Sequence, residues 1–258
     1  MKIPKKIFIF WNDPNNIPKF VNYNIDLVKR NNPDYEVFFL NKNNFEEFIN
    51  IQKYNFDFKD KILSTPMYLS DILRFLLLSV HGGVWIDASC ILWKPLDCLL
   101  HPDDTFVIFN NKHNVVRGTQ HAFESWFIAA VPEHPFIESV KDVVVSLNNF
   151  CKIKIFLDTS EVVKQLNTTK YYHFIYHVIN FVCQTCKHCL RDVRMLDTDI
   201  AYTGHMTGLP GVLYFINFSF VMEKIISNKI KYFLEDEKNI PKHVVISKLT
   251  AGVRKQLR

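Results

Sequence analysis

The first fifty residues contain short apolar runs separated by polar turns, a pattern typical of strands that alternate with helices. The run KIFIFW predicts a strand over residues 6–11, because a short apolar stretch rich in β-branched and aromatic residues suits a buried strand. An amphipathic pattern predicts a helix over residues 20–31, and EVFFL predicts a second strand over residues 36–40. A short helix is expected over residues 43–50, so the order indicates an α/β sheet with parallel strands.

The next predicted helix, over residues 66–81, has clear signals at both ends. Thr65 can cap its first turn, a proline follows at the first helical position, and HGG offers a basic last turn and a glycine stop. Four strands are predicted after it, over residues 84–86, 90–93, 106–109 and 125–130. From residue 134 onward we expect a largely helical chain, including residues 171–185 and 212–228.

Two charged residues, Asp71 and Arg74, lie one turn apart within the predicted helix over residues 66–81. A surface salt bridge, which stabilises little, is one interpretation of such a pair. However, nearly all the remaining residues from 72 to 80 are apolar, so this helix has almost no solvent-facing side. A pair on a buried helix has to line a cavity, and we therefore favour a functional role.

Asp87 comes directly after the predicted strand over residues 84–86, and Ser89 follows two residues later. In open α/β sheets, ligands bind beyond the carboxyl ends of the strands. A carboxylate at such a position can hold a divalent cation, form a hydrogen bond with a ribose or cap the following turn. The sequence around Asp87 therefore predicts a ligand site, with a structural turn as the alternative.

Composition narrows the class of protein. The chain has 258 residues, of which 48% are hydrophobic and 22% charged, as in ordinary globular proteins, and it lacks repeats and linkers, so we expect one domain. A net charge of +5 suits an anionic ligand, but the basic residues are scattered, so nucleic acid is not an expected partner. We expect a soluble, cytoplasmic protein, because no signal peptide or transmembrane segment is recognisable.

Three of the six cysteines form the segment CQTCKHC, which contains Cys183, Cys186, Cys189 and His188. The C-x-x-C spacing can supply two ligands to zinc or an iron–sulfur cluster. No second pair of ligands follows at a suitable distance, and the segment continues an apolar helical pattern. We therefore favour reduced, half-buried cysteines on a helix, and a zinc-dependent nucleic-acid binder is the weakest hypothesis.

The segments IFIFW, NPDYEVFFLN, SDILR, GGVWIDAS and ESWFIAAVPEHPFI occur in this order. Together they resemble the capsular-polysaccharide-synthesis branch of sugar-nucleotide transferases, related to glycosyltransferase family 32 and the large clostridial toxin glucosyltransferases. The resemblance covers residues 3–185 and weakens after them. It implies a GT-A fold, a Rossmann-like, mostly parallel sheet flanked by helices. Residues 1–133 would then bind the nucleotide sugar, and residues 134–258 would form a mainly helical region on the acceptor side.

The resemblance also implies a reaction, in which a sugar moves from a nucleotide-diphosphate donor to a glycan or other hydroxyl acceptor, with retention of configuration. It implies that Trp11 stacks on the nucleotide base, unless it is only a large aromatic at a strand end. Asp71 and Arg74 match the pair that grips the donor-sugar hydroxyls and diphosphate. Asp87 matches the first Asp of the D-x-D motif. Glu124 is either near the acceptor or an exposed carboxylate at a strand start.

The expected cofactor is Mn²⁺ or Mg²⁺, although Ser89 stands where a strict D-x-D motif has its second Asp. A hydroxyl alone is a poor replacement for a carboxylate on a hard cation, so the ion would depend on Asp87, diphosphate oxygens and water. His205 is a candidate ligand from the C-terminal part, and Ser247 stands where this branch tends to have a histidine. These departures keep a second hypothesis open, a catalytically inactive sugar-nucleotide-binding protein or partner subunit.

Overall fold

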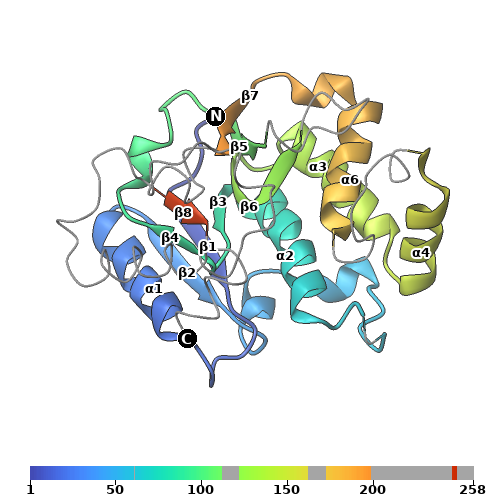
Figure 1. Ribbon diagram of the computed structural model, residues 1–258, viewed down its shortest axis with the longest axis horizontal. Coiled ribbons are helices and arrows are strands. Elements are labelled where there is room, and N and C mark those ends of the chain that lie inside the picture. Colours follow the sequence, from blue (N-terminus) through green and yellow to red (C-terminus); the bar gives the residue numbers. More distant parts are fainter. Residues whose placement is uncertain (61, 112–121, 162–172, 199–245, 249–258) are drawn as a thin grey trace, which may run out of the picture.

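A central sheet organises the protein, whose computed structural model describes residues 1–60, 62–111, 122–161, 173–198 and 246–248. Its strands are β1 (Lys6–Phe10), β2 (Glu36–Leu40), β3 (Gly83–Ile86), β5 (Phe106–Asn110), β6 (Phe123–Ala130) and β7 (Val193–Asp197). The six strands lie in the order β2-β1-β3-β6-β5-β7 (Figure 1). Strand β1 is parallel to β2 and β3, and β7 is parallel to β5, while β6 runs antiparallel to both of its neighbours.

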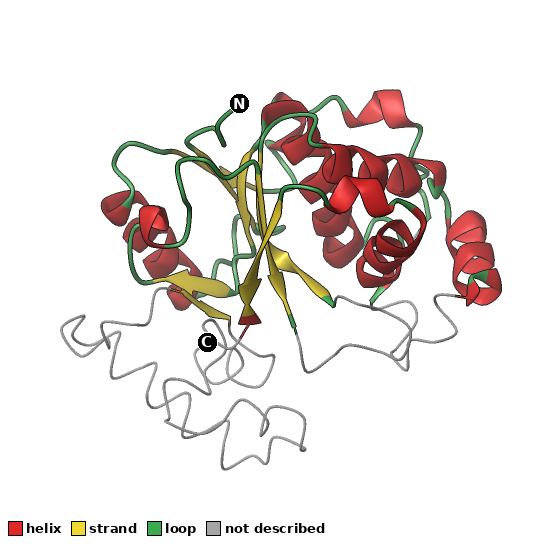
Figure 2. Ribbon diagram, turned by 90° about the horizontal axis from the view of Figure 1, so that it is seen from above, coloured by secondary structure: helices red, strands yellow, loops and turns green. Residues whose placement is uncertain are grey.

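Helices cover both faces of this sheet (Figure 2), which confirms the predicted α/β class. One face carries α1 (Lys19–Asn31) and a small sheet of β4 (Cys90–Leu92) and β8 (Ile246–Lys248). The other face carries α2 (Pro66–His81), α3 (Pro135–Ser146) and α6 (Phe174–Thr185), with α4 (Phe150–Thr159) beyond them. Among the described residues, no helix has the length and apolarity needed to cross a membrane.

The apolar run of β1 is continuous because both of its faces are buried. Ile7 and Ile9 belong to the core cluster on the α1 face, whereas Phe8 and Phe10 belong to the cluster on the α2 face. Strands buried on both sides read as unbroken hydrophobic runs rather than as an alternation. Strand β6 is likewise buried on both faces, since all eight of its residues are buried, but its apolar run is interrupted by Glu124 and Ser125.

The helix predicted over residues 43–50 is wrong, since this range contains only a 3₁₀ turn, η1 (Phe45–Glu47), and a second 3₁₀ turn, η2 (Ile51–Tyr54), follows it. Asparagine side chains bond to the backbone here. Asn44 Oδ1 accepts from the Asn41 backbone N–H at 2.7 Å, and Asn41 Oδ1 accepts from the Asn43 N–H at 2.8 Å. Such local bonds compete with a regular helix.

The expectation of a largely helical chain after residue 134 is right for α3, α4 and α6 but misses two strands. Strand β7 extends the central sheet beside β5, and β8 pairs with β4. Strand β7 reads VRMLD and β8 reads ISK, so neither contains the apolar run that predicts β1 and β2. The predicted helix over residues 212–228 lies outside the described residues.

Two glycines fix the junction between α2 and β3. Gly82 has φ 59° and ψ −159°, a conformation that is essentially restricted to glycine. A Cβ atom on Gly82 would lie 2.6 Å from Pro132 Cδ, and one on Gly83, which has φ 94°, would lie 2.7 Å from the Lys6 carbonyl oxygen. The predicted glycine stop is therefore confirmed, and it sets how β3 leaves the helix.

We predict that Gly82→Ala lowers the free energy of unfolding by about 1–3 kcal/mol, because alanine is strained at this backbone conformation and its methyl group meets Pro132. Urea unfolding monitored by circular dichroism measures the change. Val80→Ala, on the same last turn but at a residue that is 45% exposed, is the control and should shift stability by no more than about 0.5 kcal/mol. Equal stability of Gly82→Ala and the wild type would contradict the steric argument.

An ion pair between the buried carboxylate of Asp104 and the partly exposed Arg194 anchors β7. Arg194 donates from Nε to Asp104 Oδ1 at 2.6 Å and from Nη2 to Oδ2 at 2.5 Å, and the His101 backbone N–H donates to Oδ2 at 2.5 Å. Burial alone would raise the pKa of Asp104, but the bonds from Arg194 and His101 outweigh it and hold this pKa below its usual value. The ion pair therefore stabilises the ionised carboxylate.

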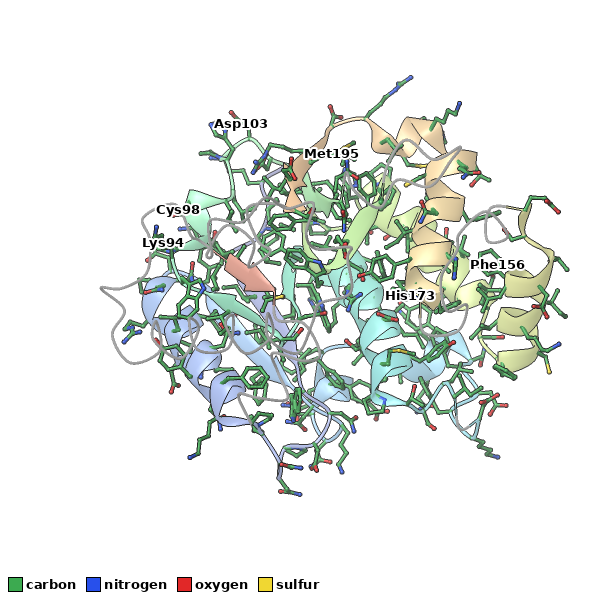
Figure 3. All side chains as sticks on the ribbon, viewed as in Figure 1. Lys94, Cys98, Asp103, Phe156, His173 and Met195 are labelled. Atoms are coloured by element: carbon green, nitrogen blue, oxygen red, sulfur yellow. A yellow bond between two sulfur atoms is a disulfide. The ribbon has the colours of Figure 1, made fainter. Side chains whose placement is uncertain are left out.

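We predict that Asp104→Asn lowers the free energy of unfolding by about 1–3 kcal/mol near pH 7, since hydrogen bonds to a charged group are lost. A lowered pKa in the folded state gives stability that is present above the unfolded pKa of about 3.8 and is lost as the pH falls below it. The difference between wild type and variant should thus shrink below about pH 4. The control is Asp103→Asn, whose exposed side chain is labelled in Figure 3. A pH-independent difference would contradict the assignment.

Candidate active site

Several predicted residues meet at one edge of the central sheet. Strands β1 and β3 are parallel, with Phe8 opposite Trp85, so Trp11 and Asp87 leave neighbouring strands on the same side. Strand β6 runs in the opposite direction beside β3, which brings Glu124, near its start, to this side as well. We call it the carboxyl edge, because the strands β1, β3, β5 and β7 all end there.

Arg74 joins helix α2 to the end of β3. Its Nη1 donates to Asp71 Oδ1 at 3.0 Å and its Nη2 donates to Asp87 Oδ1 at 2.8 Å. The guanidinium lies over the indole of Trp85, with Cζ 5.2 Å from the ring centroid, and Trp85 Nε1 donates to Asp87 Oδ1 at 2.9 Å. These four side chains form what we call the Arg74 network.

Exposure differs sharply within the Arg74 network. The side chains of Arg74 and Asp71 are 3% and 9% exposed, whereas that of Asp87 is 24% exposed. Two carboxylates and one guanidinium leave a net charge of −1. The Nε of Arg74 is buried and has no hydrogen-bond partner among the described residues. Asp87 is therefore the most exposed of these three side chains and the first that a ligand at the carboxyl edge would meet.

A second buried carboxylate lies beside the Arg74 network. Glu124, 6% exposed, accepts hydrogen bonds from Asn111 Nδ2 at 3.0 Å, Trp126 Nε1 at 3.1 Å and the Tyr176 hydroxyl at 2.8 Å. The backbone oxygen of Trp126 accepts from the Asp87 N–H at 2.8 Å, so one residue connects both clusters. The alternative of an exposed carboxylate at a strand start is wrong, because both faces of β6 are covered.

Tyr176 responds electrostatically to both clusters. Burial and the neighbouring Glu124 carboxylate raise the pKa of Tyr176 well above its usual value, and the charge of Asp87 adds to this while Arg74 opposes it. The phenol therefore stays protonated and keeps donating to Glu124. Helix α6 supplies Tyr176 in its first turn, next to His173, whose position is labelled in Figure 3.

The remaining predicted residues have different surroundings. Trp11 is partly exposed after β1, and its Nε1 donates to the Asn16 carbonyl oxygen at 2.9 Å, which ties the following loop to the sheet. Ser89 is 5% exposed in the turn after Asp87. His205 lies outside the described residues, and the backbone of Ser247 pairs with Ile91 in the small sheet.

Asp87 and Ser89 are the oxygen donors that could hold a cation at the carboxyl edge. The net negative charge of the Arg74 network favours a cation there, and both donors are of the type that hard cations prefer. Two donors are too few for six-fold coordination. In the described parts of the chain, the one group of three His, Cys, Asp or Glu ligands lies elsewhere, at Cys186, His188 and Cys189. Substrate oxygens, water or residues outside the described ranges would have to complete the set.

The prediction of reduced cysteines on a helix is wrong for two of the three. Cys186 follows the end of α6, Cys189 lies in the turn η5 (Lys187–Leu190), and the two form a disulfide. Cys183 remains a free thiol on α6, and burial raises the pKa of Cys183 to about 12.

Sequence reasoning missed four residues of the two clusters, namely Trp85, Asn111, Trp126 and Tyr176. Two of them had a local signal. Trp85 lies two residues before Asp87 and Trp126 two residues after Glu124, and residues at this spacing point to the same face of a strand. Asn111 and Tyr176 come from separate elements, so only tertiary packing brings them to Glu124.

Comparison with known families gives a clear result. Residues 1–182 match the family described as Capsular polysaccharide synthesis protein. The chain belongs to this family. The match includes every member of the Arg74 network, together with Glu124 and its three partners. The disulfide between Cys186 and Cys189 lies beyond the segment that defines the Capsular polysaccharide synthesis protein family in this chain.

Individual proteins are more distantly similar. An O-glycosyltransferase, braB, of Annulohypoxylon truncatum is 27% identical over 149 residues, which are 52% of this chain and 35% of that protein. The chain thus spans 35% of the length of this relative. Among solved structures, the galactosyltransferase LgtC in complex with donor and acceptor sugar analogs is 11% identical, with a TM-score of 0.45 over 95% of this chain and 87% of that one. The PaToxG glycosyltransferase is 18% identical, with a TM-score of 0.42 over 73% of each chain.

We predict that Arg74→Met lowers the free energy of unfolding by about 3–5 kcal/mol, because it leaves the buried Asp71 carboxylate without its cation. Adding Asp71→Asn removes that uncompensated charge, so the double variant should recover part of the loss. Urea unfolding of both variants measures the effect. The control is Arg191→Met, at an exposed arginine, which should change stability by no more than about 0.5 kcal/mol. A double variant less stable than Arg74→Met would contradict a charge-based explanation.

Proposed function

We propose that the chain is a GT-A glycosyltransferase that moves a sugar from a nucleotide-diphosphate donor to a hydroxyl group of a glycan or another acceptor. One observation carries this proposal, the convergence of Asp71, Arg74 and Asp87 at the carboxyl edge, with Asp87 accessible to solvent. Ligands of α/β sheets bind at such edges. Membership of the Capsular polysaccharide synthesis protein family and similarity to an O-glycosyltransferase support the same function.

The donor would lie across the ends of β1 and β3. We propose that its base stacks on Trp11 and that its sugar and diphosphate meet Asp71, Arg74 and Asp87. The positive charge of Arg74, held by two carboxylates, needs no reorganisation during the reaction. It would stabilise the negative charge that develops on the diphosphate as the bond to the anomeric carbon breaks. The fixed guanidinium also holds Asp87 in one orientation, which Trp85 supports.

A divalent cation, Mn²⁺ or Mg²⁺, is the proposed cofactor, and Asp87, Ser89 and His205 are its proposed protein ligands. When bound, such a cation neutralises charge on the leaving diphosphate. The net charge of the Arg74 network and the exposure of Asp87 support a cation at this position.

We assign the acceptor side to Glu124 and its neighbours. The three donors that hold Glu124 fix its position, and Trp126 connects it to Asp87. Glu124 and Tyr176 would therefore orient the acceptor hydroxyl relative to the donor. The resemblance to glycosyltransferase family 32 supports transfer with retention of configuration.

A specific observation also favours a second function, that of a catalytically inactive protein that binds sugar nucleotides. Ser89 occupies the place of the second Asp in a D-x-D motif, so the chain lacks the carboxylate that binds the cation directly in strict forms of the motif. An inactive binder would still need Trp11 and the Arg74 network, but would release no nucleoside diphosphate.

We predict that one nucleotide sugar of a UDP, GDP, CDP and dTDP panel yields free nucleoside diphosphate when it is mixed with Mn²⁺ and the protein. Asp87→Asn should lower this turnover by about 100-fold or more, because one preorganised charge at the reacting centre is lost. Asp34→Asn, at an exposed carboxylate with 76% side-chain exposure, is the matched control and should retain full activity. The melting temperature of each variant checks that it is folded.

Two outcomes would contradict the proposed transferase. If Asp87→Asn turned over as fast as the wild type, the assignment of the site would be wrong. If no donor turned over but one of them raised the melting temperature of the wild type by mass action, the chain would be the inactive binder.

A further inference from the structure

A cluster of sulfur and nitrogen ligands lies at the end of α6, outside the proposed active site. The ligand atoms of Cys186, His188 and Cys189 all lie within 4.8 Å of one another, and the Cys186 Sγ is 3.4 Å from His188 Nε2. Cys189 is buried, Cys186 is partly exposed and His188 is exposed, so the cluster is anchored on one side and accessible on the other.

The geometry suits a thiophilic cation once the two sulfurs are separated. Zinc binds thiolate sulfur at about 2.3 Å and imidazole nitrogen at about 2.0–2.1 Å with tetrahedral angles, which puts the two ligand atoms about 3.6 Å apart. The observed distance between Cys186 Sγ and His188 Nε2 is close to this value. Thiolate and imidazole ligands are those that Zn²⁺ prefers over Mg²⁺ or Mn²⁺.

A serine on a neighbouring helix supports the two sulfurs. Ser139, on α3, has its hydroxyl oxygen 3.2 Å from Cys189 Sγ, 3.6 Å from Cys186 Sγ and 2.8 Å from the Pro135 carbonyl oxygen, so its one proton can be donated either to a sulfur or to this carbonyl. Groups that contact the ligands of a metal fix their orientation and contribute to affinity. The cluster therefore contacts a second element, α3, through Ser139, in addition to the turn that carries its own residues.

We propose that Cys186, His188 and Cys189 form a zinc site that exists only when the Cys186–Cys189 disulfide is reduced. A dithiol or phosphine reductant would supply two electrons, and the sulfurs would take up two protons as the S–S bond breaks and the reductant is oxidised. Binding of Zn²⁺ then releases the two thiol protons, as thiolate ligation requires. Disulfide and metal site use the same two sulfurs, so the two states exclude each other.

The experiment uses Co²⁺ as the first probe, because sulfur-to-cobalt charge transfer gives a near-ultraviolet band that carboxylate or imidazole ligands alone do not produce. The full chain is reduced with a phosphine, which is then removed without oxygen. We expect the reduced chain to give this band with one equivalent of Co²⁺, one equivalent of Zn²⁺ to abolish it, and the disulfide form to give none. Absence of the band in the reduced chain would overturn the proposal, as would a band of equal strength in the disulfide form.

Variants test which cysteines are used. Cys186→Ser and Cys189→Ser should lose the band, whereas Cys183→Ser, on the same helix, and Cys98→Ser should keep it. Cys98 is an exposed thiol on the α1 side of the sheet (Figure 3) and controls for binding to unrelated thiols. Ser139→Ala should weaken Zn²⁺ binding about tenfold. Loss of the band in Cys183→Ser or Cys98→Ser would refute the assigned ligands. The comparison of reduced and oxidised wild type needs no variant to fold.

Discussion

The candidate site depends on one interaction, the pairing of the Arg74 guanidinium with two carboxylates. One carboxylate, Asp71, lies on the same helix, and the other, Asp87, lies at the end of β3. A buried charge that loses its partner is costly, so burial itself keeps the three groups together. The backbone reinforces this, since Gly82 and Gly83 determine how β3 leaves α2 and therefore where Asp87 lies. The contacts that pack α2 against β3 therefore also determine the geometry of the candidate site.

Trp126 extends this arrangement across the sheet. Its backbone oxygen accepts from Asp87 and its indole donates to Glu124, so the side of the site assigned to the donor and the side assigned to the acceptor share one rigid residue of a fully buried strand. Transfer between two bound molecules requires that their reacting atoms be held in a fixed relation. A central strand provides this better than a loop, because its position is determined by two neighbouring strands and two layers of side chains.

The sequence predicted most of the regular elements and singled out three of the four members of the Arg74 network, all except Trp85, for the same reason. Long apolar patterns predict helices and strands, and charged residues within such a pattern, such as Asp71 and Arg74, can be recognised as unusual. What it did not predict depends on contacts between distant segments. Tyr176 reaches Glu124 only because α6 packs against β6, and the disulfide of Cys186 needs a turn after the helix. Strand β7 joins the sheet by pairing with β5, although its sequence, VRMLD, contains no apolar run. The sequence left two interpretations of Glu124 open, a position near the acceptor or an exposed strand start, because it does not reveal that both faces of β6 are covered.

The pairing of β3 has a consequence for how the protein folds. Its neighbours are β1, where Ile7 lies opposite Val84, and β6, where Phe127 lies opposite Ile86, and the contacts with β1 are distant in sequence. Closing such long loops lowers the entropy of the chain before the contacts that compensate for this loss have formed, which slows folding. Asp87 therefore reaches its final surroundings only when segments from both sides of α2 have assembled around it. A chain in which β1 and β6 have not yet paired with β3 therefore lacks the surroundings of Asp87 described here.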